Sequence, residues 1–249
     1  MEPLGRVAEA ARNNSRWCDA LCRAHGVPGK SEPTHWIKRG KIPPYMSKLV
    51  TLGGAAAAED QLAAIRSLIE SDGATPFSIK DSFQALDLTS LGFHVLFTAR
   101  WIRWSVGTSL LGDPAEKLEW SVVSSPEGLV EWELAWRGSP ANSDAGSFNR
   151  VFPSQLLDDP ELTFLVGRQH GAAVASAALN RTDDVIGLSN VFTAAPNTGP
   201  LFPGCVRLTQ ALHPALPIVG YARGDELRAT AQAGFTELHG LTVWQYPGS

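Results

Sequence analysis

Cysteine and histidine side chains near the N-terminus are the first residues whose types and spacing could carry chemistry. In "WCDALCRAH", Cys18, Cys22 and His25 stand at i, i+4 and i+7, which places all three on one helical face. Zinc accepts such ligands, but a structural site takes four, and His35 is the only other histidine nearby. Cysteines on successive turns also suit small apolar core positions. We therefore interpret both cysteines as core residues and predict no metal site.

The remaining thiol and serine patterns give little support for nucleophilic catalysis. Cys205 is a single thiol, and His213 lies eight residues further on, beyond its reach within one helix. The segment "GTSLLGD" has a serine between spaced glycines but lacks the G-x-S-x-G pattern of a nucleophile elbow. The sequence therefore does not predict a hydrolase.

Length and composition fit a globular chain of one large domain or two smaller ones. The 249 residues are 44% apolar and 18% charged, which is ordinary for a packed core. Three cysteines, an odd number, fit a reducing cytoplasm better than a disulfide framework. The N-terminus lacks the shape of a signal peptide, and no apolar run has the length of a membrane span. We expect a cytoplasmic protein without a membrane segment.

Charge and aromatic content narrow the class of partner. The net charge is −4 with scattered Lys and Arg, whereas nucleic-acid binders usually carry a large basic face. We therefore expect no nucleic-acid partner. The eight tryptophans are interpreted mainly as core residues, with a minority available to line a small-molecule pocket.

Alternating helix and strand patterns describe an α/β chain. Ser125 as N-cap and Pro126 at the first helical position open one of the helices. Residues 162–194 read as three antiparallel strands with turns at 169–171 and 182–184. A loop with three prolines and two glycines is predicted over residues 196–204. The remaining predicted helices cover 7–25, 59–70, 206–212 and 225–233, with a short one near 153–159, and further strands are predicted around 36, 47–52, 76–83, 94–104, 118–125, 216–221 and 236–245.

A repeated pattern links the two parts of the chain. In each part a strand is followed by a loop, a helix, a proline, a strand, a Gly-Phe pair and a strand ending on tryptophan. The proline and the glycine of the Gly-Phe pair are 16 residues apart in the first part (Pro76 to Gly92) and 17 residues apart in the second (Pro217 to Gly234). We infer two related halves, 1–106 and 118–249, joined by a linker at 107–117.

The second half resembles the GNAT superfamily of acyl-CoA-dependent N-acyltransferases in the order of its elements. The ending "DELRATAQAGFTELHGLTVW" is similar to the last helix and strands of that superfamily. The resemblance covers residues 118–245 and describes a tandem or degenerate GNAT-like protein of the kind found in actinobacteria. It implies a mixed, mostly antiparallel central sheet flanked by helices, and acetyl-CoA or another acyl-CoA as co-substrate.

Carried onto this sequence, the resemblance assigns the fourth strand of the fold to residues 185–194. That strand lies along the pantetheine arm, so Asn190 or a backbone N–H would polarise the thioester carbonyl. Tyr221, after the fifth strand, or water would donate the proton. The resemblance assigns cofactor contacts to Val191, Phe192, Thr193, Asn197, Thr198, Gly199 and Gly204.

The sequence departs from the superfamily pattern at two places. Pro196, Pro200 and Pro203 each remove an N–H donor from the phosphate loop. Thr230 stands where a tyrosine often protonates the thiolate, and the fourth strand offers Ser189 and Asn190 in place of the frequent glutamate base. Both departures leave open the alternative of a catalytically degenerate GNAT-fold protein, which binds acyl-CoA or a protein partner without turnover.

The first half would supply part of the acceptor pocket under this interpretation. Asp81 stands at the matching strand end and could hold a cationic amine, although a solvated turn aspartate is the simpler explanation. Trp101 is the tryptophan we assign to the acceptor pocket. We therefore expect transfer of an acetyl or similar acyl group to the primary amine of a small metabolite, by a protein that can form a homodimer.

Overall fold

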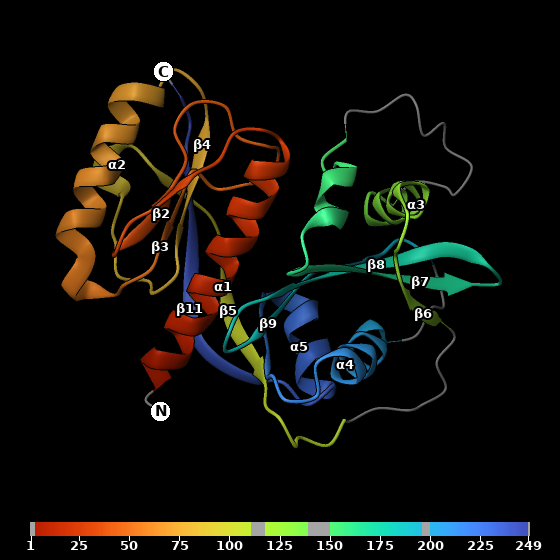
Figure 1. Ribbon diagram of the computed structural model, residues 1–249. Helices are drawn as coiled ribbons and strands as arrows, with labels where there is room; N and C mark the ends of the chain where they lie inside the picture. The colour runs from red at the N-terminus through yellow and green to blue at the C-terminus, as the bar shows by residue number, and fades with distance from the viewer. Residues whose placement is uncertain (1–2, 111–117, 139–149, 196–199, 249) are drawn as a thin grey trace. The chain divides into compact units, whose positions relative to one another are not determined.

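The computed structural model describes residues 3–110, 118–138, 150–195 and 200–248 (Figure 1). By its internal contacts the chain divides into two compact units. The N-terminal unit holds residues 1–101 and 238–249, and the C-terminal unit holds residues 102–237. Two long strands, β5 (His94–Trp104) and β11 (Thr236–Tyr246), each pass from one unit into the other.

The elements follow one another as helices and strands of mixed α/β type. The other helices and strands are α1 (Pro3–Ala24), β1 (Lys30–Ser31), β2 (His35–Ile37), β3 (Leu49–Thr51), η1 (Ala55–Ala57), α2 (Ala58–Asp72), β4 (Phe77–Asp81), η2 (Thr89–Leu91), β6 (Glu119–Val122), α3 (Pro126–Trp136), η3 (Ser154–Asp158), β7 (Leu162–Gln169), β8 (Ala172–Arg181), β9 (Ile186–Thr193), α4 (Leu201–Leu212), β10 (Ile218–Ala222) and α5 (Gly224–Gln232).

The N-terminal unit is a sheet covered by a helix on each face. Its strands lie in the order β1-β2-β3-β4-β11-β5, with β3 parallel and β11 antiparallel to β4. Side chains alternate along β4, so Ile79 packs among the apolar residues of α2 while the neighbouring Lys80 donates to Asn14 of α1. Trp36 of β2 likewise donates its indole N–H to Asp19 of α1. The alternation thus assigns one face of the sheet to each helix.

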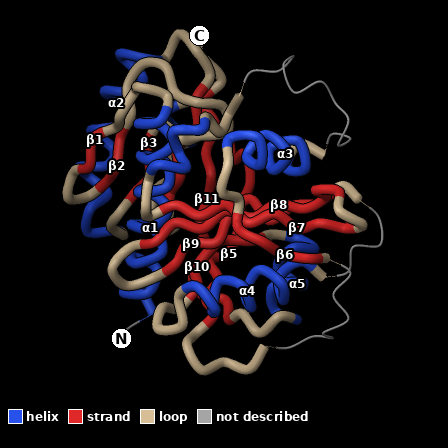
Figure 2. The backbone as a smooth tube through the Cα atoms, turned by 45° about the vertical axis from the view of Figure 1, so that its right-hand side comes forward, coloured by secondary structure: helices blue, strands red, loops and turns tan. Residues whose placement is uncertain are grey.

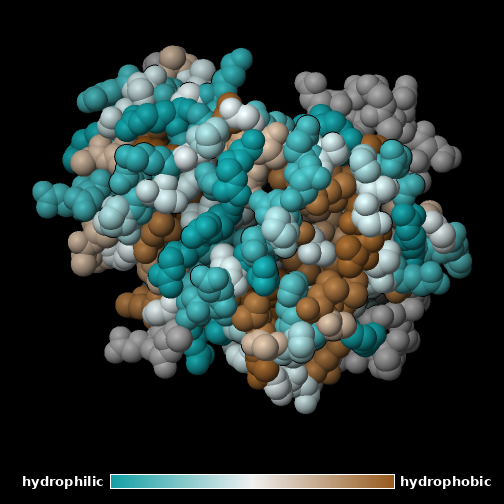
Figure 3. All heavy atoms as spheres, viewed as in Figure 1, coloured by the Kyte–Doolittle hydropathy of each residue, from teal (hydrophilic) through white to brown (hydrophobic). Residues whose placement is uncertain are grey.

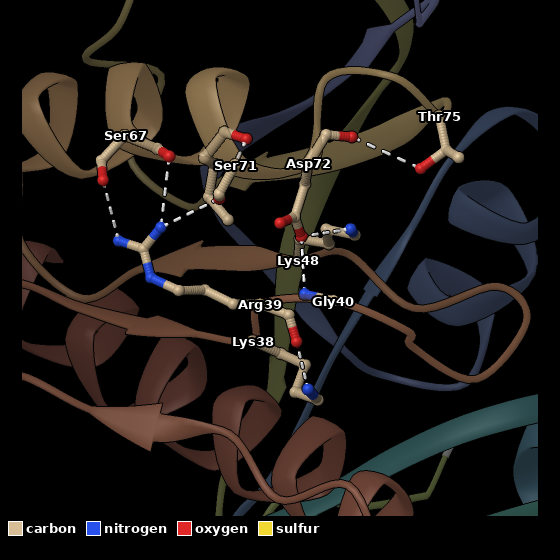
Figure 4. Close-up of polar contacts among 9 residues, drawn as sticks. Lys38, Arg39, Gly40, Lys48, Ser67, Ser71, Asp72 and Thr75 are labelled. Carbon is tan, nitrogen blue, oxygen red and sulfur yellow. Dashed lines mark hydrogen bonds and ion pairs between the residues drawn. The ribbon is translucent and has the colours of Figure 1, made fainter.

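Charged side chains fasten the loop between β2 and β3 to the end of α2 (Figure 4). Arg39 donates to Ser67 and Ser71, and Asp72 accepts from Lys48 and from the backbone N–H of Gly40. Burial alone would raise the pKa of Asp72, but the hydrogen bonds from Lys48, Ser71 and Gly40 outweigh it and lower that pKa. The carboxylate is therefore held in its charged form as part of the frame of this unit.

The C-terminal unit carries helices on both faces of its sheet (Figures 1 and 2). Its strands lie in the order β6-β7-β8-β9-β10-β5. Helix α3 and the short η3 lie on one face, and α4 and α5 on the other. Trp132 of α3 is fully buried and donates its indole N–H between Leu165 O of β7 and Ala177 O of β8, at 3.0 and 2.9 Å. On the opposite face, β8, β9 and β10 pack against Phe202 and Phe235.

Most of the elements predicted from the sequence are confirmed. The mixed, mostly antiparallel sheet is present, β5 spans the predicted residues, and Ser125 caps α3 by accepting from Gly128 N at 3.1 Å. The prediction for the fourth helix was wrong at its start: α4 begins at Leu201, inside the predicted loop. Prolines mislead here, because the first helical turn tolerates them while the interior does not.

The repeated order of elements recurs in the structure. In the N-terminal unit β3, α2, β4 and β5 occur in this order, and in the second part of the chain β9, α4, β10 and β11 do, with α5 between the last two. In both series the first and second strands pair in parallel. The division into two related halves at 1–106 and 118–249 stays a prediction.

Glu133 of α3 is a buried carboxylate on which the C-terminal unit depends. Its side chain is 0% exposed and pairs with Arg137 and Arg150. It also accepts from the backbone N–H groups of Val151 and Phe152, so it ties the chain entering η3 to α3. Removing one partner of a buried ion pair leaves the others uncompensated, which is more costly than losing a surface pair.

We predict that Glu133→Ala lowers the free energy of unfolding by about 3–5 kcal/mol. The matched control is Glu131→Ala on the same helix, whose side chain is 50% exposed in its pair with Arg168. That change should cost about 1 kcal/mol or less. Urea unfolding of both variants measures the difference, and equal costs would contradict a structural role for the buried carboxylate.

Candidate functional site

The parallel strands β9 and β10 separate after a short stretch of pairing. Among the described residues their register holds Ile186 opposite Ile218 and Gly187 opposite Val219. Beyond these pairs β9 continues to Thr193, and its residues change from buried to partly exposed after Leu188. The sheet thus opens on the β10 side of β9, within the C-terminal unit, at the carboxyl ends of two parallel strands. Ligands of open α/β sheets commonly bind at such ends.

Gly220 fixes the point at which the two strands part. A Cβ atom on this residue would lie 2.7 Å from Leu188 O of β9. The carbonyl of Leu188 therefore points toward β10, and only glycine lets the backbones approach this closely. The opening begins directly after this contact.

A β-bulge lies in β9 where the opening begins. Ala178 of β8 faces Ser189 and Ser176 faces Phe192, so β9 carries one more residue than β8 over this stretch. Asn190 takes up the extra length with a φ of +54°, in the left-handed region. Asparagine enters that region more readily than most residues, which explains an Asn at this position of β9.

The bulge reverses one peptide group. In a regular strand the carbonyl groups of Leu188 and Asn190 would point the same way, toward β10. Instead Asn190 O accepts a hydrogen bond from Ser176 Oγ of β8 at 2.9 Å. Because the peptide is trans, the N–H of Val191 points the opposite way, toward the β10 side. We infer that this backbone donor faces the opening.

The residues after the bulge complete the edge of β9. Val191 packs against the core on the α4 face, and Phe192 is 42% exposed. Thr193 donates to Val174 O and accepts from Ala195 N, which ends the strand. Apolar surface gathers over the region of β8, β9 and the neighbouring helices (Figure 3). The edge therefore offers backbone groups beside an apolar surface.

The N-terminus of α4 offers few donors. Pro200 is its N-cap and Pro203 lies in its first turn, so the free N–H groups of that turn come from Leu201 and Phe202. Gly204 lies inside the helix, where a Cβ would meet the indole of Trp120 at 2.3 Å, so this glycine admits the tryptophan. The predicted phosphate-loop residues Asn197, Thr198 and Gly199 lie outside the described residues.

The predicted proton donor lies on β10. Tyr221 is half-buried and, by alternation, on the opposite face from Ile218 and Ala222, which pack toward α4 and α5. Thr230 of α5 is buried and donates to Leu227 O within its own helix, so its hydroxyl is engaged. Tyr221 thus lies on a strand that borders the opening, whereas Thr230 lies on α5.

The two residues predicted for the acceptor pocket lie in the N-terminal unit. Asp81 is 0% exposed and accepts from the backbone N–H groups of Phe83 and Leu86, and burial raises its pKa. Trp101 is 1% exposed and donates its indole N–H to Ser82 O. Both side chains are thus used within the fold of that unit, and their role toward a substrate stays a prediction.

Three further observations concern the cysteines, metal binding and membrane spans. Cys18, Cys22 and Cys205 are buried, and desolvation raises the pKa of Cys22 to about 12. Within the described ranges, no group of three or more His, Cys, Asp or Glu side chains is placed to hold a metal ion. Of the helices in those ranges, none combines the length and apolar character that a membrane span requires.

The fold is shared with solved N-acetyltransferases. A GCN5-related N-acetyltransferase from Kribbella flavida is 17% identical over 96% of each chain, with a TM-score of 0.63. A tandem GNAT protein from the clavulanic acid biosynthesis pathway is 12% identical over 95% of this chain and 94% of its own, with a TM-score of 0.53. A GCN5-related N-acetyltransferase from Sphaerobacter thermophilus is 10% identical over 96% and 92%, with a TM-score of 0.51.

These likenesses establish the class of fold. The chain has the GNAT fold, and the resemblance seen in its sequence is confirmed at that level. Neither a protein-family profile nor a curated protein matches the sequence. The activity therefore has to be argued from the residues of the site.

Sequence reasoning found β9 but missed two of its determinants. The predicted site residues Asn190, Val191, Phe192 and Thr193 are consecutive in β9, and their role in binding stays a prediction. Ser176 and Gly220 were not predicted, although an Asn within β9 and a Gly in the middle of β10 are both signals of a local irregularity.

We predict that Gly220→Ala lowers the free energy of unfolding by about 1–3 kcal/mol, because the new methyl group overlaps Leu188 O. Gly54→Ala is the matched control, since its Cβ would make only ordinary contact with Phe83, at 3.7 Å. The control should stay within about 0.5 kcal/mol of the parent. Thermal unfolding of both variants measures the difference. A Gly220→Ala variant as stable as the parent would contradict the close approach of the β9 and β10 backbones.

Proposed function

We propose that this protein transfers an acyl group from an acyl-CoA thioester to the primary amine of a small metabolite, in the opening between β9 and β10. One observation carries the proposal. The parallel pairing ends after Gly187 and Val219, and the bulge that follows turns Asn190 O toward Ser176 of β8. From this we infer that the N–H of Val191 faces the gap. A strand edge with unpaired backbone groups can bind an extended pantetheine arm as it would bind another strand.

The backbone donor is better suited to the thioester carbonyl than the side chain of Asn190. Asn190 Nδ2 already donates to Ser189 Oγ at 3.0 Å. The N–H of Val191 is fixed by its peptide plane, so it needs no rearrangement when negative charge develops on the carbonyl oxygen. Preorganised donors of this kind stabilise the oxyanion of acyl transfer. We therefore assign polarisation of the carbonyl to Val191 N–H.

Proton transfers complete the reaction. The attacking amine must lose a proton and the departing CoA thiolate must gain one. We assign the second step to Tyr221, whose place after Val219 puts it on the strand that borders the gap. With Ser189 and Asn190 on β9 in place of a glutamate, we assign removal of the amine proton to water.

The first turn of α4 offers the phosphate groups of CoA fewer N–H donors than the phosphate loop of this fold usually provides. Among the described residues the first turn of α4 offers the N–H groups of Leu201 and Phe202, at the positive end of the helix dipole. Asn197, Thr198 and Gly199 remain the proposed further contacts. We therefore expect affinity for CoA to depend more on the pantetheine arm than on the phosphates.

Calorimetric titration with acetyl-CoA tests this proposal. We predict binding with a dissociation constant in the range of about 1–100 μM, with ATP binding at least about tenfold more weakly because it lacks the pantetheine arm. Desulfo-CoA, which keeps that arm, should bind nearly as well as CoA. Absence of acetyl-CoA binding at millimolar concentration would contradict the proposal and favour a protein that keeps the fold without the activity.

Tyr221→Phe separates binding from turnover. We predict an unchanged affinity for acetyl-CoA, and a rate of CoA release with a panel of primary amines that falls by about 100-fold or more, the usual contribution of a general acid. Thiol release followed with a chromogenic disulfide measures the rate. A variant that keeps the full rate would exclude Tyr221 as the acid.

A further inference from the structure

We propose that Ser176 of β8 is a positioning residue for acyl transfer, because its hydroxyl holds the Asn190–Val191 peptide with the N–H directed at the thioester. This inference rests on the proposed function. Ser176 is 0% exposed, and its side chain contacts the backbone of β9. Its hydroxyl donates to Asn190 O at 2.9 Å. No part of its side chain needs to meet a substrate.

The orientation of the Asn190–Val191 peptide decides whether a hydrogen-bond donor or an acceptor faces the opening. With Asn190 O turned toward β8, the opening receives the N–H of Val191. If the peptide rotated to the orientation of a regular strand, Asn190 O would point toward β10, as Leu188 O does. A carbonyl oxygen would then face the oxygen of the thioester and repel it. The hydroxyl of Ser176 therefore selects a donor over an acceptor at this position.

The surrounding ladder does not fix this peptide by itself. On the near side of the bulge Ala178 pairs with Ser189 and Leu179 with Leu188, and on the far side Ser176 pairs with Phe192. The register gives Asn190 and Val191 no directly opposite residue on β8. The carbonyl of the peptide between them is satisfied by a side chain instead, so losing that side chain frees one peptide and leaves the paired strands in place.

The test compares two ligands that differ by one oxygen atom. Acetyl-CoA carries the thioester carbonyl, and S-ethyl-CoA has the same chain with a methylene group in place of that carbonyl. The ratio of their dissociation constants therefore reports the hydrogen bond to the carbonyl and cancels the rest of CoA. We predict that the parent protein binds acetyl-CoA about fivefold more tightly than S-ethyl-CoA, as expected for one hydrogen bond. No amine is required.

Ser176→Ala should abolish this preference. We predict a ratio near one, from weaker binding of acetyl-CoA, with S-ethyl-CoA bound as by the parent. The matched control is Ser189→Ala. It removes the hydroxyl that accepts from the side chain of Asn190 but leaves the hydrogen bond from Ser176 to Asn190 O in place. The control should keep the parent ratio. Ser176→Thr, which retains the hydroxyl, should keep it as well.

Each outcome has a separate meaning. A Ser176→Ala variant that keeps the parent ratio would overturn the role of Ser176 while leaving acyl-CoA binding intact. Equal binding of the two ligands by the parent would overturn the Val191 donor and the role of Ser176 together. A parent that binds neither ligand would overturn the proposed function itself. If Ser176→Ala does not fold, Ser176→Cys gives the same test, because a thiol is a much weaker donor.

Discussion

The orientation of one peptide group, between Asn190 and Val191, is the constraint on which the candidate site depends. It requires an extra residue in β9, a left-handed conformation at Asn190 and a buried hydroxyl on β8. Each of these runs against a regular strand. Such departures persist when the surrounding structure enforces them, and they concentrate at functional sites.

The remainder of the C-terminal unit holds this irregular strand in place. Trp132 bridges the carbonyls of β7 and β8 from one face, and the buried Glu133 ties the chain before η3 to the same helix. On the other face α4 packs against Trp120 of β6 through Gly204. The β8 side of β9 is thus paired and supported by packed helices, while the β10 side opens. Rigid support beside an open edge suits a site that binds an extended ligand.

Much of the fold could be predicted from the sequence because hydrophobic periodicity and helix-capping residues are local patterns. The alternation of side chains along residues 94–104 predicted β5, and Ser125 before Pro126 predicted the start of α3. The structure confirms both. The start of α4 was misjudged because Pro203 suits a loop and a first helical turn equally. Ser176 and Gly220 were not predicted because their roles arise from contacts across strands. A local pattern can signal an irregular strand, but it does not identify the residue on the neighbouring strand that makes the contact. Asp81 was predicted at a strand end, but its burial follows from the turn that closes over it.

The amide proton of Val191 offers the most direct test of this account. In isotope-labelled protein its resonance can be followed by NMR while acetyl-CoA or S-ethyl-CoA is added. We predict a downfield shift of that proton with acetyl-CoA that S-ethyl-CoA does not produce, because only the thioester offers an oxygen to the donor. Identical shifts with the two ligands, or none with either, would contradict the central claim that this peptide is the acyl-binding group.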